Sequence, residues 1–467
     1  MIKYGLKILL MTILLTFFLN CQRLAEPDDL EILVLINGEM VDPVGPVPVE
    51  NDTALFPAQT LAEKIGLRGV FLEREEKLIL WNDRNTILIS VNSSTAYVNA
   101  HPVSLQAPAR MIEKKLMLPL RFTVESAGAT ISWAKETRTA YVQSEAEGDS
   151  PGIEIISSGP LNIKDLKDKN TEGGRLRLPL TAFVYGDLCN INNKKSTLHS
   201  IDTLKRFPYM ICGDPGTLGA DDKRVTDAIK GKVKIFGYVG MGGNTLPETA
   251  RLKSDIDKIA AAGWYGVFLD QYGYDFNETR LRQNEIVDYI HGKGLACFAN
   301  GWFIDDVLGS STDNSFNPGG AGTHLGRGDW VLLESFLTDG SGYRADIGEL
   351  MDKYIKAQKY RENLEVKIVC LSYRGKGIED TSSQAALSYL VALALGFDGW
   401  WMVDALENNE FRYSPDPGLD LGDRLEVKLM KVTPEIYIAK TDKYLIIFST
   451  EKAPPPELLF YPRKALQ

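Results

Sequence analysis

Histidine is scarce in this chain, and the cysteines form no spaced pairs. Only four histidines occur in 467 residues, which disfavours a His-rich metal site. The five cysteines include no Cys-x-x-Cys pair, which argues against a zinc knuckle and a disulfide framework. No Gly-rich phosphate motif follows a strand, and the net charge of −10 gives little attraction for nucleic acid. We therefore expect no metal, no cofactor and no nucleic-acid partner.

The composition is that of a soluble protein with more than one core. Hydrophobic residues make up 44% of the chain and charged residues 24%, which excludes wholesale disorder. A chain of 467 residues is long for a single core, so we expect two or more domains.

Residues 1–21 are typical of a targeting segment. Lys3 and Lys7 precede a largely apolar run at 8–19, which has the length of a signal peptide and is short for a membrane span. We expect the protein to be exported, and secreted or attached to the cell envelope. A lipid anchor on Cys21 is the alternative, although Asn20 differs from the small residue that a lipoprotein signal places there.

Residues 30–145 contain a tandem repeat with an offset of 62 residues. Segment 36–41 aligns with 98–103, Pro57 with Pro119, and Gly66 with Gly128. Each copy predicts a short strand and turn, a helix that begins after the proline and ends before the glycine, and then a strand pair. We expect a small α+β domain.

Residues 30–145 resemble the copper amine oxidase N-terminal-like domain. The resemblance is carried by Leu-Pro-Leu-Arg-Phe-Thr-Val-Glu-Ser-Ala-Gly-Ala at 118–129, followed by Trp133 and Arg138-Thr139. Despite its name the module implies no copper or oxidase chemistry, and the chain has no Asn-Tyr pair from which the quinone cofactor would form. The resemblance implies a unit that binds the cell wall or surface, or one that is only a spacer.

A polar stretch predicts a linker at 146–175, and a different pattern follows it. Within 176–408, short apolar runs alternate with amphipathic segments. The eight runs are 180–185, 209–212, 234–239, 266–270, 295–300, 330–334, 367–373 and 399–404. Eight strands with intervening helices predict an α/β fold, a (β/α)8 TIM barrel. Residues 409–467 contain further strand patterns and are expected to form a short C-terminal β extension.

Barrel enzymes place their chemistry at the carboxyl ends of the strands. In this chain those ends carry carboxylates, one amide and several aromatic rings, and they carry no histidine. The candidates are Tyr185, Tyr238, Asp270, Tyr272, Asn300, Trp302, Glu334, Tyr373, Trp401 and Asp404. The absence of a Ser-His or Cys-His pair disfavours acyl transfer, and the absence of histidine disfavours metal-dependent hydrolysis.

Two carboxylates among aromatic rings suit the cleavage of a glycosidic bond, which requires an acid and a nucleophile or base. Asp270 and Glu334 are the candidate pair, and Asn300 lies between their strands. Structural alternatives remain for each residue. Asp270 would cap a helix, Glu334 would form a rim ion pair, and Asn300 would belong to an Asn-Gly turn. Of Trp400 and Trp401, at least one must point away from the barrel lumen.

Segments 235–239, 266–270 and 298–301 resemble the spherulin-4-like and endo-α-1,4-polygalactosaminidase barrels, the latter being glycoside hydrolase family 114. The resemblance implies that Asp270 is the nucleophile or ion stabiliser, that Glu334 is the general acid/base, and that Asn300 matches an Asn of the spherulin-like group. Gln271 departs from the acidic or small residue that often follows this Asp.

Two functions follow as hypotheses. The first is an exported glycoside hydrolase that acts on a polysaccharide, such as the amino-sugar polymer galactosaminoglycan, with no cofactor. The second is a carbohydrate-binding or cell-envelope scaffold protein without turnover. The distance between the two carboxylates is the feature that distinguishes them.

Overall fold

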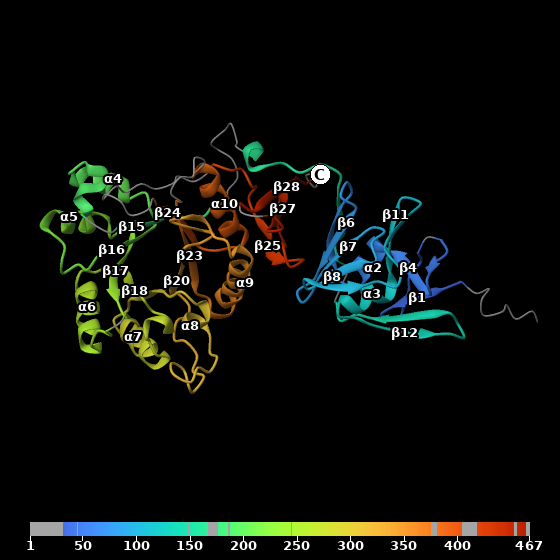
Figure 1. Cartoon of the computed structure of the whole chain (residues 1–467), viewed down its shortest axis with the longest axis horizontal. Coiled ribbons are helices and arrows are strands. Elements are labelled where there is room, and N and C mark those ends of the chain that lie inside the picture. Colours follow the sequence, from blue (N-terminus) through green and yellow to red (C-terminus); the bar gives the residue numbers. More distant parts are fainter. Residues whose placement is uncertain are drawn as a thin grey trace, which may run out of the picture. The chain divides into compact units, whose positions relative to one another are not determined.

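The computed structural model describes residues 31–43, 45–146, 150–166, 176–184, 187–243, 245–374, 381–403, 418–452 and 455–463. The chain divides into two compact units (Figure 1). One comprises Met1–Ser158 with Lys431–Pro434, and the other comprises Gly159–Met430 with Glu435–Gln467. The targeting segment and Cys21 lie outside the described residues. Within the described part of the chain, no helix combines the length and apolar character that a membrane span requires.

The first unit repeats its elements at the predicted offset. The elements β4 (Thr53–Pro57), α2 (Ala58–Lys64), β5 (Arg68–Leu72) and β6 (Lys77–Trp81) recur 62 residues later as β11 (Lys115–Pro119), α3 (Leu120–Ser126), β12 (Thr130–Ala134) and β13 (Thr139–Gln143). Pro57 and Pro119 directly precede the helices, where the fixed φ of proline suits a helix start. Gly66 and Gly128 have φ of +75° and +87°, a conformation that glycine adopts without strain after a helix.

An approximate two-fold axis relates the two copies. Strands β4 and β11 pair antiparallel, and the equivalent residues Phe56 and Leu118 are direct partners. Strand β1 (Leu33–Ile36) of copy one pairs with β13 of copy two, so each copy completes a sheet of the other. The remaining strands are β2 (Glu39–Met40), β3 (Val49–Glu50), β7 (Thr86–Ser90), β8 (Thr95–Val98), β9 (His101–Ser104) and β10 (Arg110–Ile112). This interlocking buries one core for both copies.

Part of the predicted linker is a strand of this first domain. Residues Gly152–Ile156 form β14, which pairs in parallel with β5. The polar run at the start of 146–175 predicts a linker over this whole range. The apolar Ile153 packs on the core, and the edge of β5 supplies hydrogen-bonding groups that only the tertiary structure brings near. The linker boundary was therefore placed too early.

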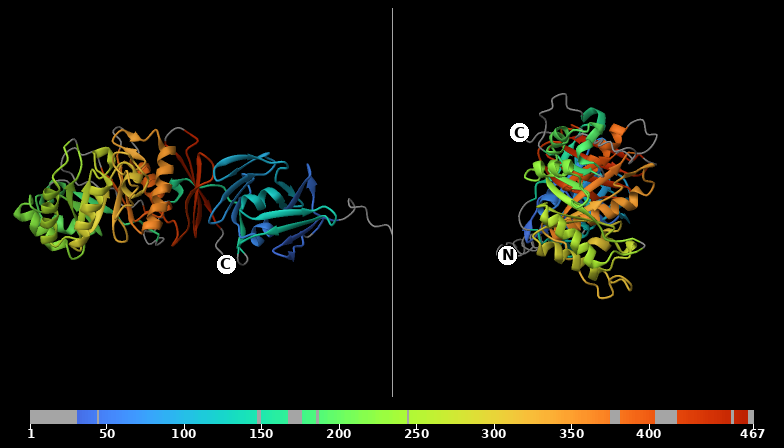
Figure 2. Two further views of the ribbon diagram at one scale, coloured as in Figure 1. Left: turned by 90° about the horizontal axis from the view of Figure 1, so that it is seen from below. Right: turned by 90° about the vertical axis from the view of Figure 1, so that its left-hand side faces the viewer.

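The second unit contains a parallel eight-stranded barrel, as predicted. Its strands follow chain order, and a bridge between Leu180 and Trp400 closes the ring, with the Trp400 N–H donating to Pro179 O at 3.0 Å. The strands are β15 (Thr181–Val184), β16 (Tyr209–Cys212), β17 (Lys234–Gly240), β18 (Gly266–Asp270), β19 (Ala296–Asn300), β20 (Trp330–Leu333), β23 (Lys367–Tyr373) and β24 (Gly399–Val403). Figure 2 shows the unit from two further directions.

Aromatic rings fill the barrel below its carboxyl end. Phe236, Phe268, Phe298 and Trp330 come from four consecutive strands, and their neighbouring ring centroids are 5.2–5.8 Å apart. Side chains alternate between the two faces of a strand, so the residues two positions further on also face the lumen. Trp400 belongs to the opposite set, because its indole N–H donates to Ser388 Oγ in the surrounding helix α10 (Thr381–Ala394).

Helices α4 (Thr197–Leu204), α5 (Ala220–Ile229), α6 (Thr249–Ala261), α7 (Arg280–Gly292) and α9 (Ile347–Leu364) surround the barrel. After β19 the chain forms only the short α8 (Ile304–Leu308) and then a long loop. The polar side chains of α7 hold that region: Arg280 donates to the carbonyls of Asp306, Val307 and Gly309. Arg280 is buried on the inner side of this helix, whereas the apolar Leu281 beside it is 81% exposed.

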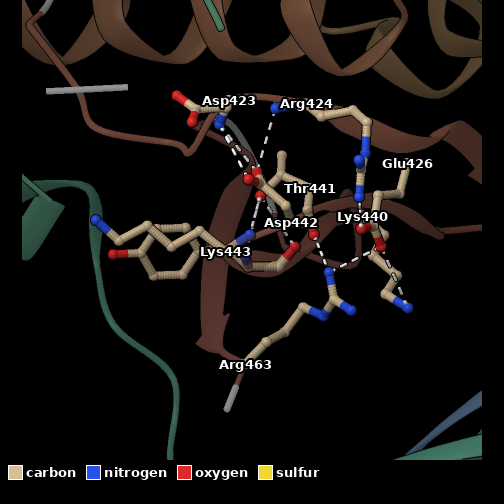
Figure 3. A network of polar contacts seen from close by, with 9 residues as sticks. Asp423, Arg424, Glu426, Lys440, Thr441, Asp442, Lys443 and Arg463 are labelled. Carbon is tan, nitrogen blue, oxygen red and sulfur yellow. Dashed lines mark hydrogen bonds and ion pairs between the residues drawn. The ribbon is translucent and has the colours of Figure 1, made fainter. Parts of the chain in front are cut away.

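A four-stranded antiparallel sheet ends the chain, in agreement with the predicted β extension. It consists of β25 (Leu425–Lys431), β26 (Ile436–Thr441), β27 (Tyr444–Ser449) and β28 (Glu457–Pro462). Figure 3 shows a network of polar contacts within this sheet and the residues directly before it. Glu426 contacts Arg424 at 2.9 Å, Arg463 at 2.8 Å and Lys440 at 3.6 Å. These three cations outweigh the effect of burial and lower the pKa of Glu426.

The arrangement around α7 predicts that Arg280 is a major stabilising residue. Replacing Arg280 with Met leaves three buried carbonyls without their donor and should lower the free energy of unfolding by about 3 kcal/mol. Denaturant unfolding measures this change. Arg327→Met is the matched control, because Arg327 pairs with Glu365 at the surface and should contribute little. Equal stability of the two variants would contradict the assignment.

Candidate active site

Five side chains from five adjacent strands meet at the carboxyl end of the barrel. Tyr238 lies near the end of β17, Asp270 ends β18 and Asn300 ends β19, while Glu334 directly follows β20 and Tyr373 ends β23. Tyr238, Asp270 and Asn300 lie two residues, and Glu334 four residues, beyond the aromatic residue of the same strand. The alternation that builds the aromatic layer therefore also directs these side chains inward. The local sequence and the barrel closure together create the cluster.

Hydrogen bonds connect the five side chains in one line. The Tyr238 hydroxyl donates to Asp270 Oδ2 at 2.8 Å, and the Tyr373 hydroxyl donates to Glu334 Oε1 at 2.6 Å. Between them, Asn300 Nδ2 donates to Asp270 Oδ1 at 2.8 Å and to Glu334 Oε2 at 2.9 Å. All four carboxylate oxygens therefore accept a hydrogen bond from protein.

The shared amide fixes the distance between the two carboxylates. Both acceptor oxygens contact the same nitrogen, and the two N–H bonds of a planar amide diverge by roughly 120°, which places the oxygens about 5 Å apart. Carboxyl separations of about 5–5.5 Å are typical of retaining glycosidases, whereas inverting enzymes need roughly 6.5–9.5 Å to admit a water. The nearest oxygens of the two carboxylates thus lie close enough for both groups to act on one bound molecule.

The backbone turns sharply after each carboxylate. Gln271 and Ser335, the residues that follow Asp270 and Glu334, have φ of 57° and 53°. Non-glycine residues rarely adopt this left-handed conformation, and such residues are concentrated at functional sites. The turn after Asp270 is held because the Tyr272 N–H donates to Asn300 O at 2.8 Å. The two strained turns keep both carboxylates at the rim.

The aromatic layer forms the floor of this site. The Tyr238 ring lies over Phe268, with centroids 6.0 Å apart. Burial, together with the negative charge of Asp270, raises the pKa of Tyr238. The phenol therefore remains a protonated donor at neutral pH. Asn300 is 8% exposed, whereas Asp270, Glu334 and Tyr373 are only half-buried and remain accessible from the barrel mouth.

Trp302 lies at the same rim with a partly exposed ring. Arg344 and Lys353 flank the ring at 5.3 and 5.2 Å from its centroid, and the Lys353 ammonium also donates to Trp302 O. Burial and the charge of Arg344 lower the pKa of Lys353 to about 8. Neither cation is predicted from the sequence, because both lie beyond the strand ends and no pattern within that segment distinguishes them from surface charges.

The structure brings together five of the ten predicted residues, and Trp302 shares their rim. Tyr272 is fully buried, because the left-handed turn at Gln271 directs its ring into the core, so it is not available to a substrate. Trp401 is 1% exposed and packs edge-on against Phe207, below the site. Both predictions of substrate contact are therefore corrected. Tyr185 and Asp404 lie outside the described residues.

A second polar cluster lies at the opposite, amino-terminal end of the strands. His291, Cys297 and Asp329 offer atoms that lie within 4.8 Å of one another, a set that could ligate a metal. Asp329 is already engaged by His291 at 3.0 Å and by the N–H groups of Cys297 and Gly326 at 2.9 Å. The hydrogen bond to Asp329 raises the pKa of His291, and burial raises that of Cys297, which disfavours the thiolate. These contacts explain the cluster as a structural one, in which Asp329 holds His291, Cys297 and Gly326 by hydrogen bonds.

Comparison with known proteins identifies the first domain. Residues 35–142 match the family model of the copper amine oxidase N-terminal domain, which confirms the resemblance seen in the sequence. Among curated proteins none matches the chain. Among solved structures, a candidate fructose-1,6-biphosphate aldolase from Coccidioides immitis is similar at 13% identity and a TM-score of 0.29, covering 48% of this chain and 76% of that chain. A similarity this low carries no argument about the chemistry of the barrel.

One buried carboxyl between β18 and α7 takes no part in the cluster. Glu278, which precedes α7, is fully buried, and neither of its carboxylate oxygens accepts a hydrogen bond. Its nearest cation is Arg282, whose Nε lies 3.5 Å from Oε2. Burial raises the pKa of Glu278 to about 7 against the opposing effect of Arg282.

This raised pKa predicts a pH-dependent loss of stability. The folded protein resists ionising Glu278, so its stability should fall as pH rises from the unfolded-state pKa towards 7 and stay lower above it. Glu278→Gln removes the effect, and its stability relative to the original chain should be greater at pH 8 than at pH 5 by about 2–3 kcal/mol. Unfolding free energies at both pH values measure this. Exposed Glu349→Gln is the control, and an equal difference at both pH values would refute the prediction.

Proposed function

We propose that the barrel is a glycoside hydrolase that cleaves a polysaccharide with Asp270 and Glu334. The observation that carries the proposal is the single amide nitrogen of Asn300 in contact with both carboxylates. The resulting separation of about 5 Å suits a two-carboxylate mechanism with a covalent intermediate. The partly exposed Trp302 ring offers an apolar face for sugar C–H groups at the same rim.

In this mechanism one carboxylate attacks the anomeric carbon while the other protonates the departing oxygen. The resemblance of segment 266–270 to the polygalactosaminidase barrels favours Asp270 as the nucleophile and Glu334 as the general acid. In the second step Glu334 acts as the general base that activates water. Tyr238 and Asn300 orient Asp270 through its two oxygens, and Tyr373 orients Glu334. An amino-sugar polymer such as galactosaminoglycan, outside the cell or in its envelope, is the substrate that the resemblance favours.

A binding function without turnover is the second candidate. It is favoured by the full hydrogen bonding of all four carboxylate oxygens, because structural ion and hydrogen-bond networks show the same saturation. In that case the barrel would hold a glycan at its rim, and the first domain would attach the protein to the wall. The two functions differ in whether product is released.

Conservative changes to the carboxylates separate the two candidates. Asp270→Asn and Glu334→Gln should each reduce the release of reducing ends by at least about a thousandfold while leaving the melting temperature nearly unchanged. Galactosaminoglycan, chitosan-like polymers and peptidoglycan are suitable substrates. Glu349→Gln, an exposed change in α9, should retain full activity. Saturable glycan binding with no product from the unchanged protein would instead support the binding function.

The carboxylate separation also predicts the stereochemistry. The first product released should keep the anomeric configuration of the substrate, because two displacements restore it. Proton NMR of the anomeric signals in the first minutes of hydrolysis distinguishes the outcomes. Product of inverted configuration would show that the carboxylates act across a water, and would rule out Asp270 as a nucleophile.

A further inference from the structure

The two copies of the tandem repeat differ at one sheet edge. In copy one the outer edge of β5 is covered by β14. In copy two the equivalent strand, β12, is the last strand of its sheet within the described residues. An uncovered edge presents backbone N–H and C=O groups that can pair with another extended chain. Of the two equivalent outer edges, that of β5 is therefore occupied and that of β12 is open.

The occupied edge shows how a strand is held there. Gln59, the second residue of α2, accepts a hydrogen bond from the Ile153 N–H at 3.0 Å, and the Ser150 hydroxyl donates to Leu67 O at 2.6 Å. The helix and the strand thus hold β14 from two sides. The residue 62 positions after Gln59 is Arg121, the second residue of α3. It lies 3.5 Å from Ile131 O of β12 and 3.3 Å from Glu125.

A cavity of 380 Å³ lies beside β12, between this strand, α3, β13 and the turn that joins β3 to β4. Its lining includes Leu120 and Arg121 of α3, Ile131 and Trp133 of β12, and Lys135. Trp133 is 43% exposed, whereas its counterpart Phe71 in copy one is 5% exposed. A large ring left half-exposed beside an open edge and a cavity has the features of an unoccupied peptide-binding site.

The charges define the kind of peptide. Arg121, Lys135 and Arg138 line the cavity, and Asp52 is the acid among its lining residues. The segment that ends in β14 is itself acidic, since residues 145–154 contain three glutamates and one aspartate and no lysine or arginine. Glu145 of that segment forms an ion pair with Arg84 at 3.2 Å. The strand on the occupied edge, β14, carries one acidic residue, Glu154, between apolar neighbours.

We propose that the open edge of β12 binds an acidic, extended peptide segment of a partner protein, which adds a strand to the sheet as β14 does on β5. Backbone hydrogen bonds to β12 supply affinity, and the basic lining supplies the preference for acidic residues. Apolar side chains at alternate peptide positions lie beside Ile131 and Trp133. The site belongs wholly to the first domain and does not depend on the chemistry of the barrel.

A labelled peptide tests the proposal. The probe is a fluorescein-labelled synthetic peptide with the sequence of residues 143–157, and fluorescence anisotropy measures its binding to the full chain. Binding should saturate and weaken as salt is added. Trp133→Ala and Arg121→Glu should each weaken it by at least about tenfold. Lys114→Glu, an exposed charge reversal in the same domain but outside the cavity lining, should leave it unchanged.

Three outcomes would overturn the proposal. One is the absence of saturable binding, and another is undiminished binding by Trp133→Ala. The third is self-association of the full chain through this edge, detected by light scattering and abolished by Trp133→Ala, which would identify a second copy as the occupant. Asp270→Asn should bind the peptide normally, so failure of the peptide site and failure of the proposed hydrolase are separate results.

Discussion

The hydrogen bonds of one amide group hold the candidate site together. Asn300 Nδ2 contacts a carboxylate on each side, and the two tyrosine hydroxyls complete the line from β17 to β23. This line exists only because five neighbouring strands end at one level and present the same face to the lumen. A shift of one residue in the register of β19 would turn Asn300 outward and separate the carboxylates from their common donor.

The surroundings of the site are arranged to keep that line fixed. The aromatic layer below it packs ring against ring across the lumen and supports the side chains from beneath. Beside it, the buried Arg280 fastens the loop region after β19, so that the chain leaves Asn300 in a defined direction. The left-handed residues Gln271 and Ser335 are tolerated because the surrounding contacts hold them in place. Rigidity here comes from packing around the rim rather than from the polar groups alone.

The first domain illustrates a different use of repetition. Two copies of one short motif share a core by exchanging strands around the Phe56–Leu118 pair, and neither copy forms a complete sheet alone. The exchange leaves the two outer edges, of β5 and β12, in different states. A repeat can therefore provide stability through its symmetric interior and a binding surface through its asymmetric edge. That the same domain family matches residues 35–142 agrees with the repeat boundaries.

The sequence by itself determined the repeat, the eight barrel strands and the residues at their ends. These features depend on local patterns, namely prolines and glycines at helix boundaries and short apolar runs that end in Asp, Asn or Glu. Only the tertiary structure decided which end residues share a site. Tyr272 and Trp401 have the same local setting as Tyr238 and Tyr373, yet they are buried, because a left-handed turn and a lower layer in the lumen direct their rings away from the rim. The cations beside Trp302 and the strand β14 were equally beyond the sequence, since their partners lie far away in the chain and meet them only when the sheets close.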